Sequence, residues 1–303
     1  MSGLGARDAG PLGSGPAGAS RSGNLPAPGG RPPATGRVDR SALRSTLVAL
    51  VSTVVFFGAV GWIVVHAPGW PAVQRSFLDG QVWAQSVPDI VPAFLVNVQL
   101  FCIAEVLILV LALLLAVLRS LPGPVFFPLR LLSTIYTDFF RAVPGVLIIY
   151  LLGFGIPGLQ IRGVPNSPFF YAVVALTLVY SAYVSEVYRA GIQSVHPSQE
   201  AAARSLGLTQ LQALRFVVLP QAVRRVIPPL LNDFIGLQKD TVLVSYIGVV
   251  EIFRQSQIDE AAAFNFTPYI VTALVFLVVT VPMARFVDVL IARDRRRFLA
   301  GAR

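Results

Sequence analysis

Charged side chains inside apolar runs are the residues of this sequence that could do chemistry. Each charge at the centre of a membrane helix costs about 2.5 to 3.5 kcal/mol, so it needs a partner, a cavity or the interface. Lys239 is the only lysine, and it lies beside Asp240 in a largely apolar run, with Asp233 before it and Thr241 after it. We expect a polar pathway that is lined or gated by Asp233, Lys239, Asp240 and Thr241. A purely structural polar network is the alternative.

Two more charged pairs lie near the ends of apolar runs. Asp138 and Arg141 are three residues apart, and Glu186 and Arg189 repeat that spacing. Side chains at this spacing share a helix face, so each pair could form an ion pair. A structural ion pair near the interface is the favoured interpretation. The second interpretation is a place in the pathway, with Asp138, Arg141 and Glu186 as its candidates.

Residue types that would indicate catalysis or metal binding are scattered. The two histidines, His66 and His196, lie at or outside the ends of apolar runs, and the one cysteine, Cys102, lies inside a run. The sequence also lacks GxxxxGK[ST], the loop that holds nucleotide phosphates. We therefore expect no enzyme, no metal and no cofactor in this chain.

The amino-acid composition indicates which kind of structural element positions these residues. Of the 303 residues 55% are hydrophobic and only 13% are charged, and the mean hydropathy is +0.70. Such a chain is an all-α integral membrane protein. The net charge of +9 does not indicate nucleic-acid binding, because the basic residues lie at membrane boundaries.

The N-terminal segment differs from the rest. Residues 1–36 contain ten Gly and six Pro with few large apolar residues, which predicts a disordered tail over residues 1–40. The first 40 residues hold no apolar core, so we expect no cleaved signal peptide.

Six apolar runs reach the roughly 20 residues that a helix needs to cross a bilayer. The third and fifth contain Pro and charged residues, so we expect them to be broken or tilted. The runs are Ser45–His66, Ala93–Leu118, Leu131–Leu152, Phe169–Tyr188, Val226–Val249 and Tyr269–Ile291.

Arginine placement predicts the orientation. Eighteen arginines lie in the two tails, the second-to-third loop and the central loop, including a basic tail at residues 292–303. The alternate segments hold only Arg75, Arg162 and Arg254. Cytoplasmic segments retain basic residues, so both termini and the central loop are expected in the cytoplasm.

The central loop is polar and basic, and its chemistry predicts two short helices. Ser198 is expected to cap the first and Gly207 to end it. Thr209 with Gln212 three residues later predicts a capping box for the second. Pro220 is then expected to close the unit.

The second of these helices carries an apolar stripe. Leu211, Leu214 and Val218 share one face at helical spacing. Because the stripe lies in a polar loop between membrane segments, we expect it to dock on a partner. A loop that folds onto its own membrane domain is the alternative.

The loop also fits a known spacing: Glu-Ala-Ala, three residues, Gly, nine residues, an aliphatic residue, any residue, Leu-Pro. Gly207, Val217, Leu219 and Pro220 occupy those places. The chain thereby resembles the permease subunits of ATP-binding-cassette (ABC) importers of the polar amino acid branch. Three other segments are similar to that branch: YTDFFRAVP, YVSEVYRAGIQSV and LQKDTVLVSYIGVVEI.

One residue departs from the pattern. The family's glutamate falls on Ala201 and its alanines on Ala202 and Ala203, while Glu200 stands one place early. One residue turns a side chain by about 100° on a helix. Glu200 is also suited to the positive N-terminus of its helix, which would be a structural role.

The resemblance implies a five-helix core over residues 93–291, with a coupling loop at 189–220 and an extra N-terminal span at 45–66 outside it. It implies a second permease subunit, identical or paralogous, two ATPase subunits that bind ATP, and an extracytoplasmic solute-binding protein. The solute would be a polar amino acid, and the location the cytoplasmic membrane of a prokaryote. The residues implied to contact the ATPase are Glu200, Ala201, Ala202, Ala203, Gly207, Leu211, Leu214, Val218, Leu219 and Pro220.

Three other functions stay open. An ion-gradient-driven secondary transporter would use intramembrane acids such as Asp233 and Asp240. A membrane-embedded enzyme would need catalytic residues gathered at one face, where only Glu186, His196 and Glu200 are available. A signalling or scaffold protein would present the loop without moving a solute.

Overall fold

The computed structural model describes residues 40–121 and 123–301, and the side chains of 44–121 and 123–293. Every regular element within these ranges is a helix, as predicted. The predicted disordered tail lies outside the described residues, except for its last residue. The chain separates into two units, residues 1–65 and 66–303, which are described in turn.

The first unit contains one described helix, α1 (Arg40–Val65). It contains the predicted first span: residues 44–65 are long and apolar enough to cross a bilayer, and their side chains are exposed. The hydroxyls of Ser52 and Thr53 donate to the carbonyl of Ala49 at 2.9 and 2.7 Å, so these polar groups are satisfied inside the helix. The helix thus presents apolar side chains on every face, as lipid contact requires.

The second unit begins with two helices, α2 (Trp70–Phe77) and α3 (Gly80–Ser120). Asp79 caps the start of α3, because its Oδ1 accepts hydrogen bonds from the backbone N–H groups of Gln81 and Val82 at 2.8 and 3.2 Å. The helix therefore begins 13 residues before the start of the predicted second span at Ala93. At 41 residues α3 is about 60 Å long, roughly twice the hydrocarbon thickness of a bilayer.

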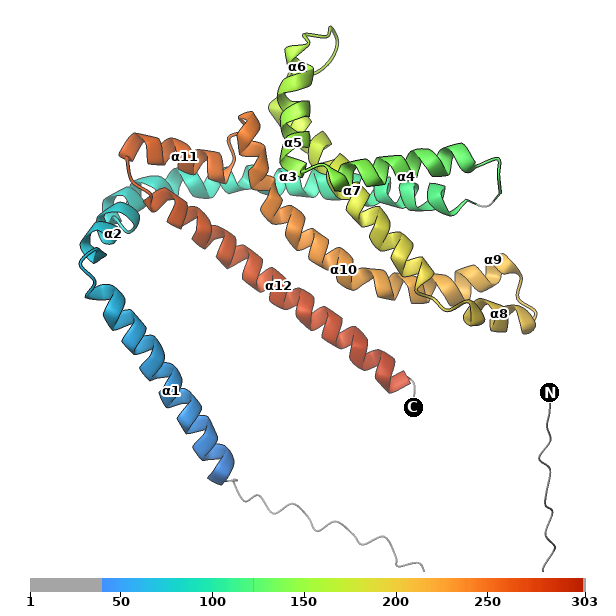
Figure 1. Ribbon diagram of the computed structural model, residues 1–303, viewed down its shortest axis with the longest axis horizontal. Helices are drawn as coiled ribbons and strands as arrows, with labels where there is room; N and C mark the ends of the chain where they lie inside the picture. The colour runs from blue at the N-terminus through green and yellow to red at the C-terminus, as the bar shows by residue number, and fades with distance from the viewer. Residues whose placement is uncertain (1–39, 122, 302–303) are drawn as a thin grey trace, which may run out of the picture. The chain divides into compact units, whose positions relative to one another are not determined.

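The core forms where α3 packs against α7 (Pro168–Gln193). Fully buried alanines on both helices, among them Ala104, Ala112 and Ala172, allow the backbones to approach closely. Leu100, Ile108 and Leu176 fill the space between them. The run predicted as the fourth span is this central helix, which crosses α3 in Figure 1 and is long and apolar enough to cross a bilayer.

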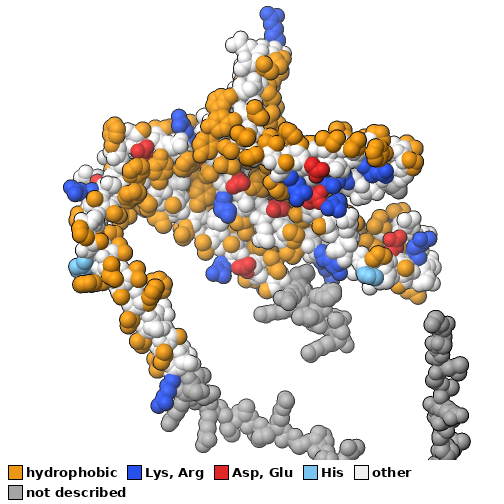
Figure 2. Space-filling view, viewed as in Figure 1, with side chains coloured by type: hydrophobic (Ala, Val, Ile, Leu, Met, Phe, Trp, Pro, Cys, Tyr) orange, Lys and Arg blue, Asp and Glu red, His pale blue; other side chains and the backbone are white. Residues whose placement is uncertain are grey.

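The predicted third span is broken. It consists of α4 (Phe127–Ala142), α5 (Gly145–Tyr150), a π-helical turn η1 (Leu151–Gly155) and α6 (Ile156–Gly158). The chain turns by 104° between α4 and α5, where Pro144 interrupts the helix. The α5–η1–α6 segment, here called the arm, projects from the rest of the unit in Figure 1, and its side chains are mostly hydrophobic in Figure 2.

The C-terminal part contains four elements. α10 (Leu219–Asp240) continues into a 3₁₀ helix, η3 (Thr241–Ile247), which ends at Gly248 with a φ of +86°. The run predicted as the fifth span thus changes from α-helix to 3₁₀ helix at Thr241. α11 (Ile252–Ala263) lies where the sequence predicted only a loop, and α12 (Thr267–Gly301) extends the sixth span through most of the predicted basic tail.

Within the described ranges, four helices are long and apolar enough to cross a bilayer, or five if the bent α4–α6 segment counts as one. α10 is not among these helices, since it contains three prolines and several charged residues. Six spans and cytoplasmic termini stay predictions.

Candidate functional site

The loop between α7 and α10 folds as a helical hairpin whose first helix is α8 (Pro197–Ser205). The imidazole Nδ1 of His196 accepts from the backbone N–H of Ser198 at 3.2 Å, so the prediction that Ser198 caps the helix is wrong. Pro197, which is well suited to the first helical position, sets the start earlier. Gly207 ends this part of the hairpin with a φ of +89°, as predicted.

The second helix, α9 (Gln210–Ala213), begins with the predicted capping box. The backbone N–H of Gln212 donates to Thr209 Oγ1 at 3.3 Å, and the N–H of Thr209 donates to Gln212 Oε1 at 2.9 Å. Pro220 does not close the unit. A π-helical segment, η2 (Leu214–Val218), connects α9 directly to α10.

Pro220 lies in the first turn of α10 and has no N–H to donate. The wider π turn precedes it, and Gln221 Nε2 donates to the carbonyl of Val217 at 3.0 Å. α9, η2 and α10 therefore form one continuous helical segment.

The predicted apolar stripe divides between two surfaces. Leu211 is 73% exposed and Leu214 is also exposed, whereas Val218 is only 8% exposed. Val218 packs against Val195 and Ala222 inside the chain, so its place in an exposed docking stripe is wrong. The exposed apolar side chains of the hairpin are Leu206, Leu211, Leu214, Phe216 and Leu219, here called the hairpin patch.

The alanine motif lies on α8. Ala201 and Ala202 are exposed, and Ala203 is buried. Glu200 lies in the first turn of α8 and is half-buried, where the helix dipole favours a carboxylate. Its side chain forms no ion pair with any described residue. The structure thus brings the motif and the hairpin patch onto one small helical unit.

The root of the hairpin is tied to α7 by close contacts. A Cβ built on Gly191 would lie 2.0 Å from Val226 Cγ2, so α7 and α10 approach each other there as closely as a glycine permits. Nearby, the guanidinium of Arg225 donates to the carbonyl of Ser194 at the end of α7. The root of the hairpin is therefore packed tightly between α7 and α10.

The pathway candidates on α10 and η3 have different surroundings. Asp240 Oδ2 accepts from the hydroxyl of Tyr180 on α7 at 2.7 Å. Asp233 is half-buried, and its Oδ2 is buried without a hydrogen-bond partner among the described residues. Lys239 is exposed, and Thr241 is fully buried. The two carboxylates of α10 are thus half-buried, and neither forms an ion pair with a described residue within 4 Å.

Asp138 and Arg141 on α4 do not form the pair expected from their spacing: no ion pair within 4 Å joins them. Both are exposed. The guanidinium carbon of Arg141 instead lies 6.0 Å from the ring centroid of Tyr183, a cation–π contact with α7. The structure therefore does not bring these residues into the α10 group.

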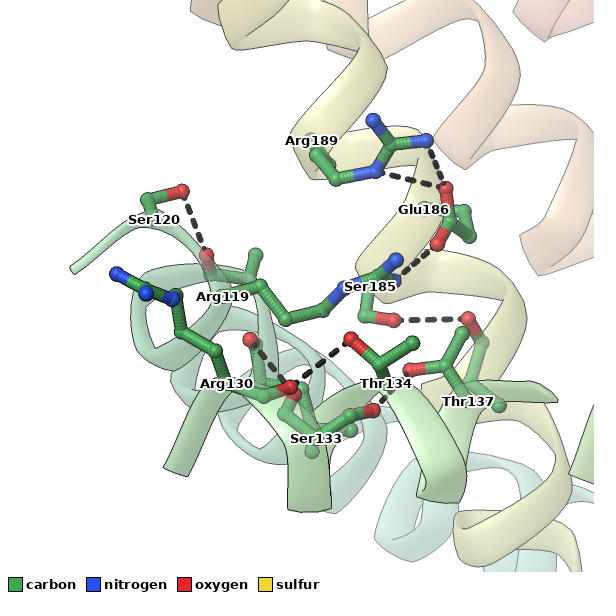
Figure 3. A network of polar contacts seen from close by, with 12 residues as sticks. Arg119, Ser120, Arg130, Ser133, Thr134, Thr137, Ser185, Glu186 and Arg189 are labelled. Atoms are coloured by element: carbon green, nitrogen blue, oxygen red, sulfur yellow. Dashed lines mark hydrogen bonds and ion pairs between the residues drawn. The ribbon is translucent and has the colours of Figure 1, made fainter. Parts of the chain in front are cut away.

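Glu186 is the centre of an ion triad that joins α3 and α7. One carboxylate oxygen accepts from Arg119 at the end of α3, and the other lies 2.6 Å from Arg189 Nη2 (Figure 3). The predicted pair of Glu186 with Arg189 is confirmed, and Arg119 is a partner that the sequence did not indicate. Next to the triad, Ser133 Oγ donates to the carbonyl of Leu115 at 3.0 Å and attaches α4 to α3.

A second polar network lies at the junction of α3, η3 and α11. Glu251 is 0% exposed. Its Oε2 accepts from Asn97 Nδ2 at 2.9 Å and from the N–H of Phe253 at 3.0 Å, and its Oε1 accepts from the N–H of Arg254 at 2.8 Å. The carboxylate thus caps α11 as well as bonding to α3.

Asn97 completes this network. Its Oδ1 accepts from the N–H of Ile252 at 3.1 Å, and its Nδ2 also donates to Thr241 Oγ1 at 3.0 Å. Burial raises the pKa of the Glu251 carboxyl, while the hydrogen bonds from Phe253, Asn97 and Arg254 oppose that shift.

Asn97 and Glu251 are not among the site residues predicted from the sequence. The available indication was that Glu251 is the only carboxylate between residues 241 and 258, in an apolar neighbourhood that would require a partner. Its partner is 154 residues away along the chain, and no local pattern identifies it.

Residues 108–296 match the family described as the binding-protein-dependent transport system inner membrane component. The chain belongs to this family. That range is more than half of the sequence, and it contains the hairpin, the triad and the buried Glu251. The resemblance to ABC importer permeases is thereby confirmed.

Known relatives agree. The probable glutamine ABC transporter permease protein GlnM of Bacillus subtilis is 39% identical over 177 residues, which are 57% of this chain and 80% of that protein. The glutamate transport system permease protein GluC of Corynebacterium glutamicum is 34% identical over 213 residues, which are 67% of this chain and 92% of that protein.

A solved structure described as an amino acid ABC transporter with histidines is 30% identical, with a TM-score of 0.65 over 71% of this chain and 98% of that one. An inward-facing structure of the MetNI methionine ABC transporter, at 15% identity and a TM-score of 0.55, shares the fold. The chain is a multi-pass inner-membrane permease subunit of an ABC importer. These likenesses support the ABC importer and not the ion-gradient alternative.

The ion triad of this permease gives a first testable prediction. Glu186→Ala should destabilise the fold by roughly 2 kcal/mol, because it leaves the charges of Arg119 and Arg189 without their common partner. That figure is below the value for a fully buried pair, since the Glu186 and Arg119 side chains are 16% exposed. Thermal denaturation of the purified permease complex measures the change.

The matched control is the pair of Arg285 and Asp288, which lies at 3.8 Å with side chains 81% and 68% exposed. Arg285→Ala should cost less than about 0.5 kcal/mol. Equal losses for the two variants would show that the triad adds no more than a surface pair.

Proposed function

We propose that this permease forms, with an identical or paralogous second subunit, the pathway by which a polar amino acid crosses the cytoplasmic membrane. Two separate ATPase subunits bind and hydrolyse ATP, and an extracytoplasmic solute-binding protein delivers the amino acid. The chain itself catalyses no reaction and binds no cofactor.

The hairpin patch is the observation that carries this proposal. Exposed leucines and a phenylalanine on a hairpin with a basic, polar surface are unfavourable in water and suit a protein cleft. The sequence has no nucleotide-binding loop of its own, so a docked ATPase supplies the energy. The arginine distribution supports a cytoplasmic hairpin, where ATP is available.

The amino acid substrate is supported by the relatives. GlnM and GluC are named for glutamine and glutamate, and the solved structure at 30% identity is of an amino acid transporter. Their shared chemical feature is the α-amino acid group, so we propose this class and no single member. Asp233, Lys239, Asp240 and Thr241 remain our candidates for the inner part of the pathway, with Asp138, Arg141 and Glu186 nearer its ends.

Movement of the hairpin would drive the pathway. Closure of the two ATPases on ATP would push the paired hairpins, and the close contact of Gly191 with Val226 would pass this movement to α7 and α10. The pathway would then alternate between its two openings.

The docking proposal predicts a ranking of hairpin variants. Leu211→Asp should reduce ATP-driven uptake roughly tenfold or more, because it places a charge in the apolar contact. Folding should be unaffected, since Leu211 is largely exposed. Gly207→Asp should also reduce uptake, because its φ of +89° strains any other residue. Uptake in membrane vesicles and co-purification of the ATPases measure both effects.

Glu200→Ala is the matched comparison within the same hairpin. It should reduce uptake by no more than about twofold, because Glu200 stands one position away from the family's glutamate. If Glu200→Ala abolished docking and Leu211→Asp did not, the displaced glutamate would be the main ATPase contact and the hairpin patch would not.

A further inference from the structure

A cavity of about 330 Å³ lies between the arm, η3 and the start of α11. This volume is at the lower end of the range for small-molecule sites, and it suits a single amino acid better than a peptide or an oligosaccharide. Its lining combines aromatic and polar side chains, namely Tyr150, Phe154, Ser245, Tyr246, Arg254 and Gln257. A second cavity, between α3 and α7, is lined almost wholly by aliphatic side chains and offers no charged group.

The aromatic wall of this cavity is held in place by packing. The rings of Tyr150 and Tyr246 stack with centroids 5.9 Å apart, and Phe154 lies 5.7 Å from Tyr150. Behind them, a Cβ built on Gly153 would come within 2.6 Å of Ile247, so η1 and η3 are in close contact. The two sides of the cavity therefore have a fixed spacing.

Two polar groups of the cavity have unused hydrogen-bonding capacity. Ser245 is only 4% exposed, and its Oγ has no hydrogen-bond partner among the described residues. Arg254 donates from Nη1 to Gln257 Oε1 at 2.9 Å, and no carboxylate among the described residues lies within 4 Å of its guanidinium. A buried hydroxyl without a partner is unfavourable unless a ligand or water satisfies it.

The Glu251 network positions the charged group. The backbone N–H of Arg254 donates to Glu251, and Asn97 holds the same carboxylate from α3. The first turn of α11 is thus fixed, and the Arg254 side chain starts from a rigid backbone beside the cavity. Rigid support of this kind is what precise binding of a small solute requires.

We propose that this cavity is a subsite for a zwitterionic α-amino acid. The Arg254 guanidinium binds the α-carboxylate, the Tyr150 and Tyr246 rings face the α-ammonium, and the Ser245 hydroxyl hydrogen-bonds to the bound solute. On the orientation proposed above, the site lies on the external side, where the solute enters before it meets the α10 carboxylates. This inference rests on the proposed function.

The test is direct binding to the complete permease–ATPase complex without binding protein, using radiolabelled L-glutamine, L-glutamate and L-arginine as probes. At least one should bind saturably, and its α-amide should fail to compete because it lacks the carboxylate. Arg254→Gln should weaken that binding about tenfold or more, and Arg254→Lys by less. Arg162→Gln, the control in the loop between α6 and α7, should bind as the unmodified protein does.

Ser245→Ala distinguishes a role of the Ser245 hydroxyl in solute binding from a role in folding. It should weaken binding about threefold while leaving the melting temperature unchanged, because the hydroxyl makes no internal hydrogen bond. Normal binding by Arg254→Gln, equal competition by the α-amide, or no binding of the three probes would overturn the subsite. ATP-driven uptake by the unmodified protein is measured in parallel. If the unmodified protein takes up an amino acid but the subsite is overturned, the proposed function stands. If it takes up no amino acid, the proposed function is overturned as well.

Discussion

Gly191→Val is expected to destabilise the permease by about 3 kcal/mol and to reduce the amount of assembled complex in the membrane. The new Cβ would lie 2.0 Å from Val226 Cγ2 and 3.4 Å from both Val226 Cβ and the carbonyl oxygen of Ala222. α7 and α10 would have to separate at the root of the hairpin. The melting temperature of the purified complex and its yield from membranes measure the effect.

A compensating pair tests whether this contact is the cause. Gly191→Ala should destabilise the permease, and adding Val226→Ala should recover much of the loss, because it removes the Cγ atoms that the new methyl group meets. Gly155→Ala is the control, since a Cβ at Gly155 meets no atom within 4 Å. If Gly191→Ala were as stable as Gly155→Ala, the two helices would have room to spare.

Glu251→Ala is the second large effect that we expect. It removes the acceptor for Asn97 Nδ2 and for the N–H groups of Phe253 and Arg254, and the Glu251 side chain itself is fully buried. Each buried donor left without a partner costs about 1 to 3 kcal/mol, so the total loss should be roughly 3 kcal/mol or more. Thermal denaturation measures this loss, and uptake should fall because the start of α11 is released.

Three variants test whether hydrogen bonding, and not volume alone, explains this loss. Glu251→Gln keeps the side-chain volume and part of the acceptor capacity, so it should be milder than Glu251→Ala. Asn97→Asp should be severe, because it places a second carboxylate against Glu251 and removes the Nδ2 donor. Adding Glu251→Gln to Asn97→Asp should improve stability, since the glutamine amide can donate to the new carboxylate. Additive losses in that double variant would contradict a direct interaction.

Features set by neighbouring residues were predictable from the sequence. Gly207 and the capping box of Thr209 with Gln212 occur as expected, because each depends on residues within one turn of a helix. The break in the third span was also indicated, since Pro144 interrupts a helix whatever packs around it.

Features set by distant contacts were not predictable. Val218 has the spacing of an exposed stripe, but the tertiary contacts with Val195 and Ala222 bury it. Pro220 suggested an end to the hairpin, yet a π turn and the side chain of Gln221 accommodate it inside a continuous helix. Among the candidate site residues, Glu186 gained Arg119 as a partner from a helix that lies 67 residues earlier. Local spacing indicates the helix face on which a side chain lies. Tertiary packing decides whether that face is exposed and which partner the side chain contacts.

The continuity of α9, η2 and α10 determines how an ATPase could act at a distance. α10 alone is about 33 Å long, comparable to the hydrocarbon thickness, and Asp233 and Asp240 lie in its far half. A rotation of the docked hairpin would reach these carboxylates through the π turn of η2 and past Pro228 and Pro229, which interrupt the regular helix. The stiffness of these two irregular points would thus set the precision with which ATP closure and pathway opening stay in step.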